Sequence, residues 1–123
     1  MPLNRKDQQI IEHLIDYCAE VHLALVTFHQ DKNIFMKSPV FRNACSMPIM
    51  QIGELAKNLS EEFQNRNSEI PWPAIKGMRN IFAHDYHSMD KEMIWETSIH
   101  SIPKLSQQLK NILRRNLENE YSR

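Results

Sequence analysis

The order of apolar and polar positions predicts a long amphipathic helix at each end of the chain. Between Arg5 and Phe28, apolar side chains recur every three or four residues, and polar side chains fill the intervening positions. We expect Asn4 to cap this first helix, because an asparagine side chain can accept a hydrogen bond from a free amide at a helix N-terminus. The last helix carries an equivalent apolar stripe, formed by Ile102, Leu105, Leu109, Ile112, Leu113 and Leu117.

A second helix is expected from Ser38 to Leu59. Ser38 suits the capping position, and the proline that follows it suits the first helical position, where the missing N–H has no partner in any case. Pro48 lies inside this segment and should kink or split the helix, because it removes one backbone hydrogen bond. Gly53 is small enough to let another helix approach closely. The polar segments on either side of this helix are interpreted as connections.

A third helix is predicted from about Pro73 to His84, entered through a rigid Pro-Trp-Pro sequence. Asp90 is the expected cap of a fourth helix, and Pro103 is expected to interrupt the helical path before the last one. No internal repeat and no long linker divides the chain. These elements predict an all-α fold, with one domain over residues 1–123 built as an antiparallel bundle of four to five helices.

Composition narrows the classes of function. The chain has only 2 glycines, so it contains no glycine-rich phosphate loop and no dinucleotide-binding fingerprint. Its 15 basic and 15 acidic side chains balance, which argues against tight, indiscriminate binding to nucleic acid but is compatible with a local basic patch. No apolar run approaches the length of a membrane span, and the N-terminus lacks an apolar signal region, so we expect a cytoplasmic protein without membrane association. Cys18 and Cys45 are interpreted as small buried hydrophobes, with a single bridge as the alternative.

The segment Lys76–His87 places polar groups beside apolar ones, and four of its side chains form a candidate site: Arg79, Asn80, His84 and Tyr86. On an ideal α-helix, Asn80 and His84 would share one face, so that Asn80 could hold the imidazole in one tautomer. Arg79 and Tyr86 would lie on the adjacent face. A histidine can transfer a proton near neutral pH, and a guanidinium can bind a phosphate and stabilise charge on its oxygens. This chemistry suits cleavage of an RNA phosphodiester by the substrate's own 2′-hydroxyl, without a metal ion or a cofactor.

Each of these residues also has a plainer interpretation. Arg79 could pair with Glu54, whose charge is unexpected within the apolar second helix, and Glu54 could also orient Arg79 or lie at a dimer interface. His84 could be a hydrogen-bonded core histidine, and Tyr86 a packed aromatic residue with a bonded hydroxyl. His84 and His87 could bind a metal, but no set of further ligands converges with them in the sequence, so no metal is expected.

The motif Arg79-x4-His84-x-Tyr86 resembles the active-site motif of HEPN-domain proteins, and in particular that of the HepT-like toxin family. Further segments resemble sequences of this family in the same order along the chain. They are the family's Ile-Gly-Glu-Ala helix, its Pro-Trp and Met-Arg-Asn run, and its Trp-Glu-Thr helix, which correspond here to residues 49–60, 70–80 and 94–97.

The resemblance implies an all-α, HEPN-like homodimer that acts as a metal-independent endoribonuclease. It also implies a toxin that works beside a minimal nucleotidyltransferase antitoxin, which adds adenylate groups to the motif tyrosine. Arg79 would then bind phosphate, His84 would be the acid and base, Asn80 would match the polar residue that often follows the arginine, and Tyr86 would be the modified residue. Pro48 departs from the family's pattern and leaves the exact line of its helix open. The alternative is a non-catalytic HEPN partner or nucleotide-binding subunit of a nucleotidyltransferase.

Overall fold

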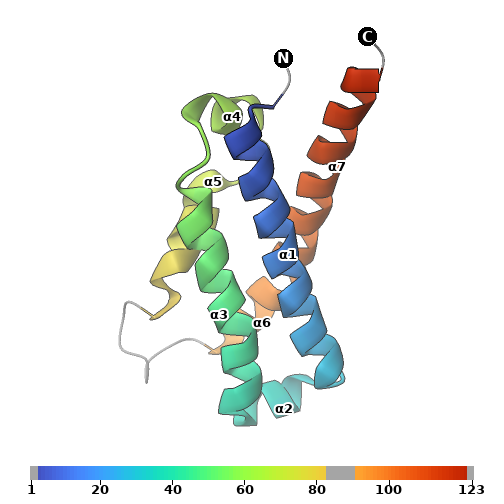
Figure 1. Cartoon of the computed structure of the whole chain (residues 1–123). Helices are drawn as coiled ribbons and strands as arrows, with labels where there is room; N and C mark the ends of the chain where they lie inside the picture. The colour runs from blue at the N-terminus through green and yellow to red at the C-terminus, as the bar shows by residue number, and fades with distance from the viewer. Residues whose placement is uncertain (1–2, 83–90, 122–123) are drawn as a thin grey trace.

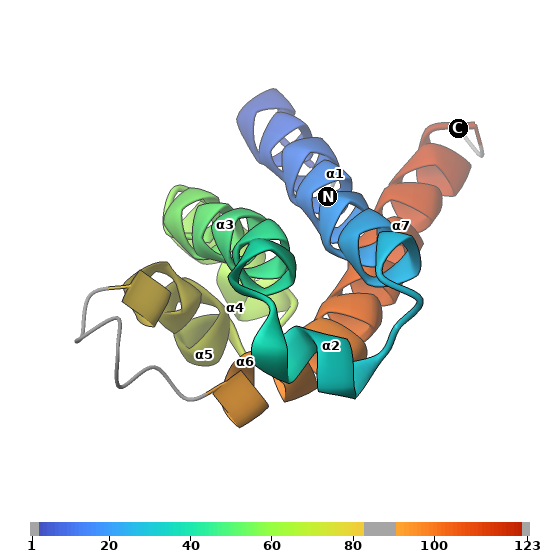
Figure 2. The same ribbon diagram turned by 90° about the horizontal axis from the view of Figure 1, so that it is seen from below.

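The computed structural model describes residues 3–82 and 91–121, without the side chains of residues 81 and 82. Throughout these ranges the ordered elements are helical and no β-strand occurs, so the prediction of an all-α fold is confirmed. Three long helices form the body: α1 (Arg5–Thr27), α3 (Pro39–Ala56) and α7 (Ile102–Tyr121). Helix α1 lies between the other two and packs against both, as Figures 1 and 2 show.

Shorter elements connect the long helices. Helix α2 (Lys32–Lys37) lies between α1 and α3 in the chain, and α4 (Glu61–Arg66) follows α3. Helix α5 (Trp72–Gly77) continues directly into a 3₁₀-helix, η1 (Met78–Phe82), and both lie along the side of α3 that faces away from α7 (Figure 2). Helix α6 (Lys91–Glu96) and a π-helical turn, η3 (Thr97–Ser101), lead into α7.

The predicted caps begin the first and third α-helices. The Asn4 side chain accepts a hydrogen bond from the Asp7 amide at 2.7 Å, which satisfies one of the free N–H groups of α1. The Ser38 hydroxyl accepts a hydrogen bond from the Phe41 amide at 3.1 Å, and Pro39 occupies the first position of α3. Both helix starts are therefore encoded locally, as expected.

The two polar segments interpreted as connections contain short helices, α2 and α4, so that interpretation was wrong. In α2, Asp31 accepts hydrogen bonds from two amides of the first turn, and Phe35 is fully buried. In α4, Ser60 caps the first turn and Phe63 is buried. Each helix thus combines a capping residue with one phenylalanine three or four positions later, a pattern too short for periodicity to reveal.

The prolines interrupt less than their sequence positions predict. Helix α3 runs unbroken through the buried Pro48, so the predicted split does not occur. Pro103 lies in the first turn of α7 rather than in a gap, because the chain passes from α6 through the wide turn of η3 into that helix. In both cases one missing hydrogen bond is tolerated because the neighbouring turns are packed on the bundle.

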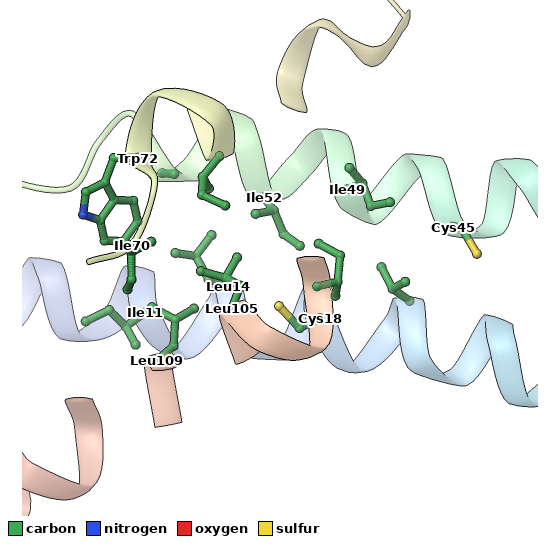
Figure 3. Close-up of a cluster of buried hydrophobic side chains, with 14 of the residues drawn as sticks. Ile11, Leu14, Cys18, Cys45, Ile49, Ile52, Ile70, Trp72, Leu105 and Leu109 are labelled. Carbon is green, nitrogen blue, oxygen red and sulfur yellow. The ribbon is translucent and has the colours of Figure 1, made fainter. Parts of the chain in front are cut away.

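The hydrophobic core fills the space between α1, α3 and α7, where side chains from all three helices meet (Figure 3). At one end of it, Phe41 stacks on Phe28 with ring centroids 4.5 Å apart. Phe41 and Phe35 make a T-shaped contact with ring centroids 5.1 Å apart. Trp95 of α6 packs against Phe35, also at 5.1 Å. This ring cluster joins α2, α3 and α6, and explains why two short helices are ordered there.

The two cysteines are free and buried, as expected of small apolar residues. Burial raises the pKa of the Cys18 thiol to about 12 and that of Cys45 to about 11. Neither is a thiolate near neutral pH, so neither is a candidate nucleophile. Within the described ranges, no helix combines the length and hydropathy needed to cross a membrane.

Candidate active site

The candidate site begins where helix α5 tightens into η1. The sequence predicted one continuous α-helix from Pro73 to His84, but the α-helix ends at Gly77 and a 3₁₀-helix occupies residues 78–82. A 3₁₀-helix turns about 120° per residue instead of about 100°, so side chains three positions apart align. The α-helical geometry assumed for the faces of Arg79 and Asn80 therefore does not hold over residues 78–82. Whether Asn80 shares a face with His84 stays a prediction.

Gly53 determines how closely η1 approaches α3. This residue is buried, and a Cβ atom built on it would lie 2.9 Å from the carbonyl carbon of Met78, 3.1 Å from the Arg79 Cα atom and closer still to the Arg79 amide nitrogen. Backbone atoms cannot rotate out of the way as a side-chain end can. Only glycine therefore permits this contact, and the close approach predicted at Gly53 is confirmed, with a 3₁₀ turn as the approaching element.

The Arg79 backbone is fixed while its side chain remains accessible. Met78 is partly buried and packs against the core, so it anchors the start of η1. Arg79 and Asn80 are both exposed. This arrangement places a guanidinium at the surface on an immobilised backbone, a geometry suited to binding an anion from solvent.

Glu54, the residue after Gly53, forms an ion pair with Lys57 instead of the anticipated pair with Arg79. The hydrogen bond from Lys57 lowers the pKa of the Glu54 carboxyl group, and the positive charges of Lys57 and then Arg79 act in the same direction. Arg79 is thus close enough to influence Glu54 without bonding to it. Sequence reasoning did not single out Lys57, although its spacing of three from Glu54 and four from Gly53 was a usable signal.

The remaining residues of the predicted motif, His84 and Tyr86, lie outside the described residues, as do His87 and the expected cap Asp90. Their roles stay predictions. Within residues 3–82 and 91–121, no group of three or more histidine, cysteine, aspartate or glutamate side chains could hold a metal ion.

The fold and the site define an all-α domain in which an exposed arginine lies on a 3₁₀ turn. The backbone of that turn packs against a glycine of the neighbouring helix. The family model described as "Ribonuclease HepT-like" matches residues 8–112, and the chain belongs to that family. The resemblance seen in the sequence motifs is thereby confirmed.

Individual relatives agree with this assignment. The chain is 35% identical over 107 residues to "Putative RNase TTE0752" of Caldanaerobacter subterraneus subsp. tengcongensis, covering 85% of this chain and 92% of that protein. It is 30% identical over 122 residues to "Gamma-glutamylcyclotransferase and putative RNase MJ0434" of Methanocaldococcus jannaschii, covering 96% of this chain but 54% of that longer protein. A shorter match of 37% over 54 residues, 44% of this chain and 49% of the relative, is to "Probable ribonuclease HepT" of Thermococcus cleftensis. No solved structure matches the chain.

Proposed function

We propose that this protein is a metal-independent endoribonuclease that cleaves RNA with Arg79 and His84. The observation that carries the proposal is the exposed Arg79 guanidinium, whose backbone is held against Gly53 in a member of the HepT-like family. The names of several relatives as ribonucleases support RNA as the substrate class. The protein's match to 92% of the first of these relatives supports a shared activity rather than a shared fragment.

In the proposed reaction, the 2′-hydroxyl of the substrate attacks the adjacent phosphorus while His84 accepts its proton. The bond between phosphorus and the 5′-oxygen of the next nucleotide breaks, and His84 gives the proton that it accepted to that oxygen as it leaves. The products are a 2′,3′-cyclic phosphate and a 5′-hydroxyl, so no water and no redox partner is consumed. Arg79 binds the non-bridging oxygens and stabilises the negative charge that develops on them. Asn80 orients the imidazole through a hydrogen bond.

The biological role that we propose is that of a toxin paired with a minimal nucleotidyltransferase antitoxin, in the cytoplasm. Tyr86 is two residues from His84, so an adenylate group added to its hydroxyl would place bulk and negative charge beside the catalytic pair and exclude RNA. We further propose that the protein works as a homodimer. A site carried by one short turn is open, and a two-fold related copy would deepen it into a groove.

The decisive assay incubates the purified protein with single-stranded RNA in the presence of a chelator. We expect the wild type to release cyclic-phosphate products, and His84→Ala to lose about 10²–10⁴-fold in rate. Arg79→Ala should lose about 10²–10³-fold. Arg5→Ala removes an exposed arginine at the start of α1 and should leave the rate unchanged. An RNA with a 2′-deoxy sugar at the cleavage site should resist cleavage.

Equal, background-level cleavage in the wild type and His84→Ala would contradict the nuclease and favour a non-catalytic partner or nucleotide-binding subunit. Circular dichroism of each variant shows whether the fold is retained. The antitoxin proposal is tested separately with a minimal nucleotidyltransferase and ATP. The wild type should gain the mass of one or more adenylate groups and lose activity, whereas Tyr86→Phe should gain none and remain active.

A further inference from the structure

A second cation shares the surface on which Arg79 is presented. Lys57 is the C-cap residue of α3, four positions after Gly53, and its side chain is exposed. Residues four apart lie on the same face of an α-helix, about 6 Å apart along its axis. Lys57 therefore leaves α3 on the face that receives the Arg79 backbone at Gly53, about one turn further along.

Glu54, the residue after Gly53, carries the negative charge on this surface. Its carboxylate bonds to the Lys57 ammonium, and the charge of Arg79 is near enough to help keep the same carboxylate ionised. The positive charges of Lys57 and Arg79 and the negative charge of Glu54 thus share one surface, which is formed by the last turn of α3 and by η1. Because Lys57 is already held by Glu54, its side chain loses less conformational entropy on meeting a ligand than a free lysine would.

We propose that Lys57 is a second phosphate-binding residue of the RNA site, with Glu54 as the positioning residue that holds its ammonium beside Arg79. This inference rests on the proposed function, since it takes RNA as the substrate. The planar fork of the Arg79 guanidinium suits the reacting phosphate, which needs geometric control. The compact Lys57 ammonium suits a neighbouring phosphate that only has to be held in register. Lys57 is then a binding residue, and it does not touch the reacting atoms.

The competing interpretation is an ordinary surface ion pair. Exposed pairs of this kind contribute little to stability. Under this interpretation Lys57 makes no contact with RNA, and removing it does not change RNA binding. Lys37 provides a matched control, because it is an exposed lysine directly before the N-cap of α3, whereas Lys57 is the C-cap at the other end. Eighteen helical residues separate the two ends by roughly 27 Å.

The test measures binding of single-stranded RNA with methylated 2′-hydroxyls, which cannot be cleaved, by fluorescence anisotropy over a range of NaCl concentrations. We expect Lys57→Ala to bind about fivefold more weakly at low salt, and the slope of log affinity against log salt to fall by about 0.7, the loss of one phosphate contact. Lys57→Arg should keep the wild-type slope, and Lys37→Ala should behave as the wild type. On cleavable RNA, Lys57→Ala should raise KM and leave kcat within about twofold.

The outcomes separate this inference from the proposed function. Wild-type affinity and slope in Lys57→Ala, or a loss no greater than that of Lys37→Ala, overturns the phosphate subsite even if the protein cleaves RNA. If no variant cleaves RNA but Lys57→Ala loses affinity and slope as described, the subsite stands and the nuclease is overturned. A wild-type protein that binds no RNA overturns both.

Discussion

The two faces of helix α3 are packed in different ways. The face toward α1, α2 and α6 is closed by side chains, and its members Phe41, Cys45, Ile49, Ile52 and Ala56 are fully buried. The face toward η1 is closed at Gly53, where the backbone of Met78 and Arg79 lies against the helix without an intervening side chain. The first face is the scaffold and the second presents the candidate site.

The two faces of α3 should respond differently to amino-acid substitution. Side chains can shift rotamers and partly fill a cavity, so damage to the first face is spread over the core and appears as lost stability. A backbone-to-backbone contact has no such freedom, so an added methyl group at Gly53 must displace η1 as a unit. Mutations on the two faces should therefore separate stability from activity.

The largest effect on stability is expected at Phe41. Phe41→Ala removes a fully buried ring that contacts Phe28, Phe35 and Trp95, and should lower the free energy of unfolding by about 3–5 kcal/mol. Val40→Ala, at a neighbouring residue that is 69% exposed, is the control and should change it by less than about 0.5 kcal/mol. Urea denaturation measures both. Equal effects of the two substitutions would show that the ring cluster does not organise this end of the bundle.

The two glycines offer the sharpest test of the contrast between the faces. Gly53→Ala should displace η1 and reduce RNA cleavage about 100-fold, because a misplacement of about 1 Å can cost that much, while the helical circular-dichroism signal is retained. Gly77→Ala should leave activity unchanged and stabilise the protein by up to about 1 kcal/mol, because nothing lies within 4 Å of an added Cβ and alanine favours helix. Wild-type activity in Gly53→Ala would mean that η1 can move without loss.

A polar contact within the scaffold should follow the behaviour of the first face. Asp7 is buried and accepts hydrogen bonds from the Ser60 amide at 2.8 Å and the Ser60 hydroxyl at 2.6 Å, which ties α1 to the start of α4. Asp7→Asn replaces one of the two oxygens that accept these hydrogen bonds with an NH₂ group, which can only donate. It should lower the free energy of unfolding by about 2 kcal/mol and leave kcat/KM unchanged. Asp16→Asn, on the exposed surface of the same helix, is the control. Lost activity at full stability in Asp7→Asn would contradict this division.

The smallest effect concerns the charges beside Gly53. NMR titration should give Glu54 a carboxyl pKa below the ordinary glutamate value, and Lys57→Ala should raise it toward that value. Because the pKa of Glu54 is lowered in the folded state, its ion pair is complete above the ordinary glutamate pKa and is lost as the pH falls through the lowered one. Near neutral pH the Glu54 carboxylate therefore stays ionised, and its titration should not change RNA binding at the proposed phosphate subsite. An unchanged Glu54 pKa in Lys57→Ala would show that the ion pair does not form in solution.

Much of the scaffold was predictable, because its signals are local. The three- and four-residue spacing of apolar positions and the capping side chains of Asn4 and Ser38 act within a few residues, and the structure confirms the helices that they predict. The short helices α2 and α4 escaped prediction because each depends on one phenylalanine whose burial requires distant partners. Of the candidate site, the sequence indicated Arg79, Asn80 and Glu54, and also His84 and Tyr86 outside the described residues, but it did not indicate how the described ones are arranged.

The amino-acid sequence by itself determined the all-α class, the main helix boundaries and the family, since periodicity, caps and ordered motifs are properties of neighbouring residues. Only the tertiary structure decided that α5 tightens into a 3₁₀ turn at Met78 and that Arg79 is pressed against Gly53. Both depend on α3 meeting a segment more than twenty residues further along the chain. Contacts of that range are set by the packing of the whole bundle, which overrides the local preference for a continuous helix.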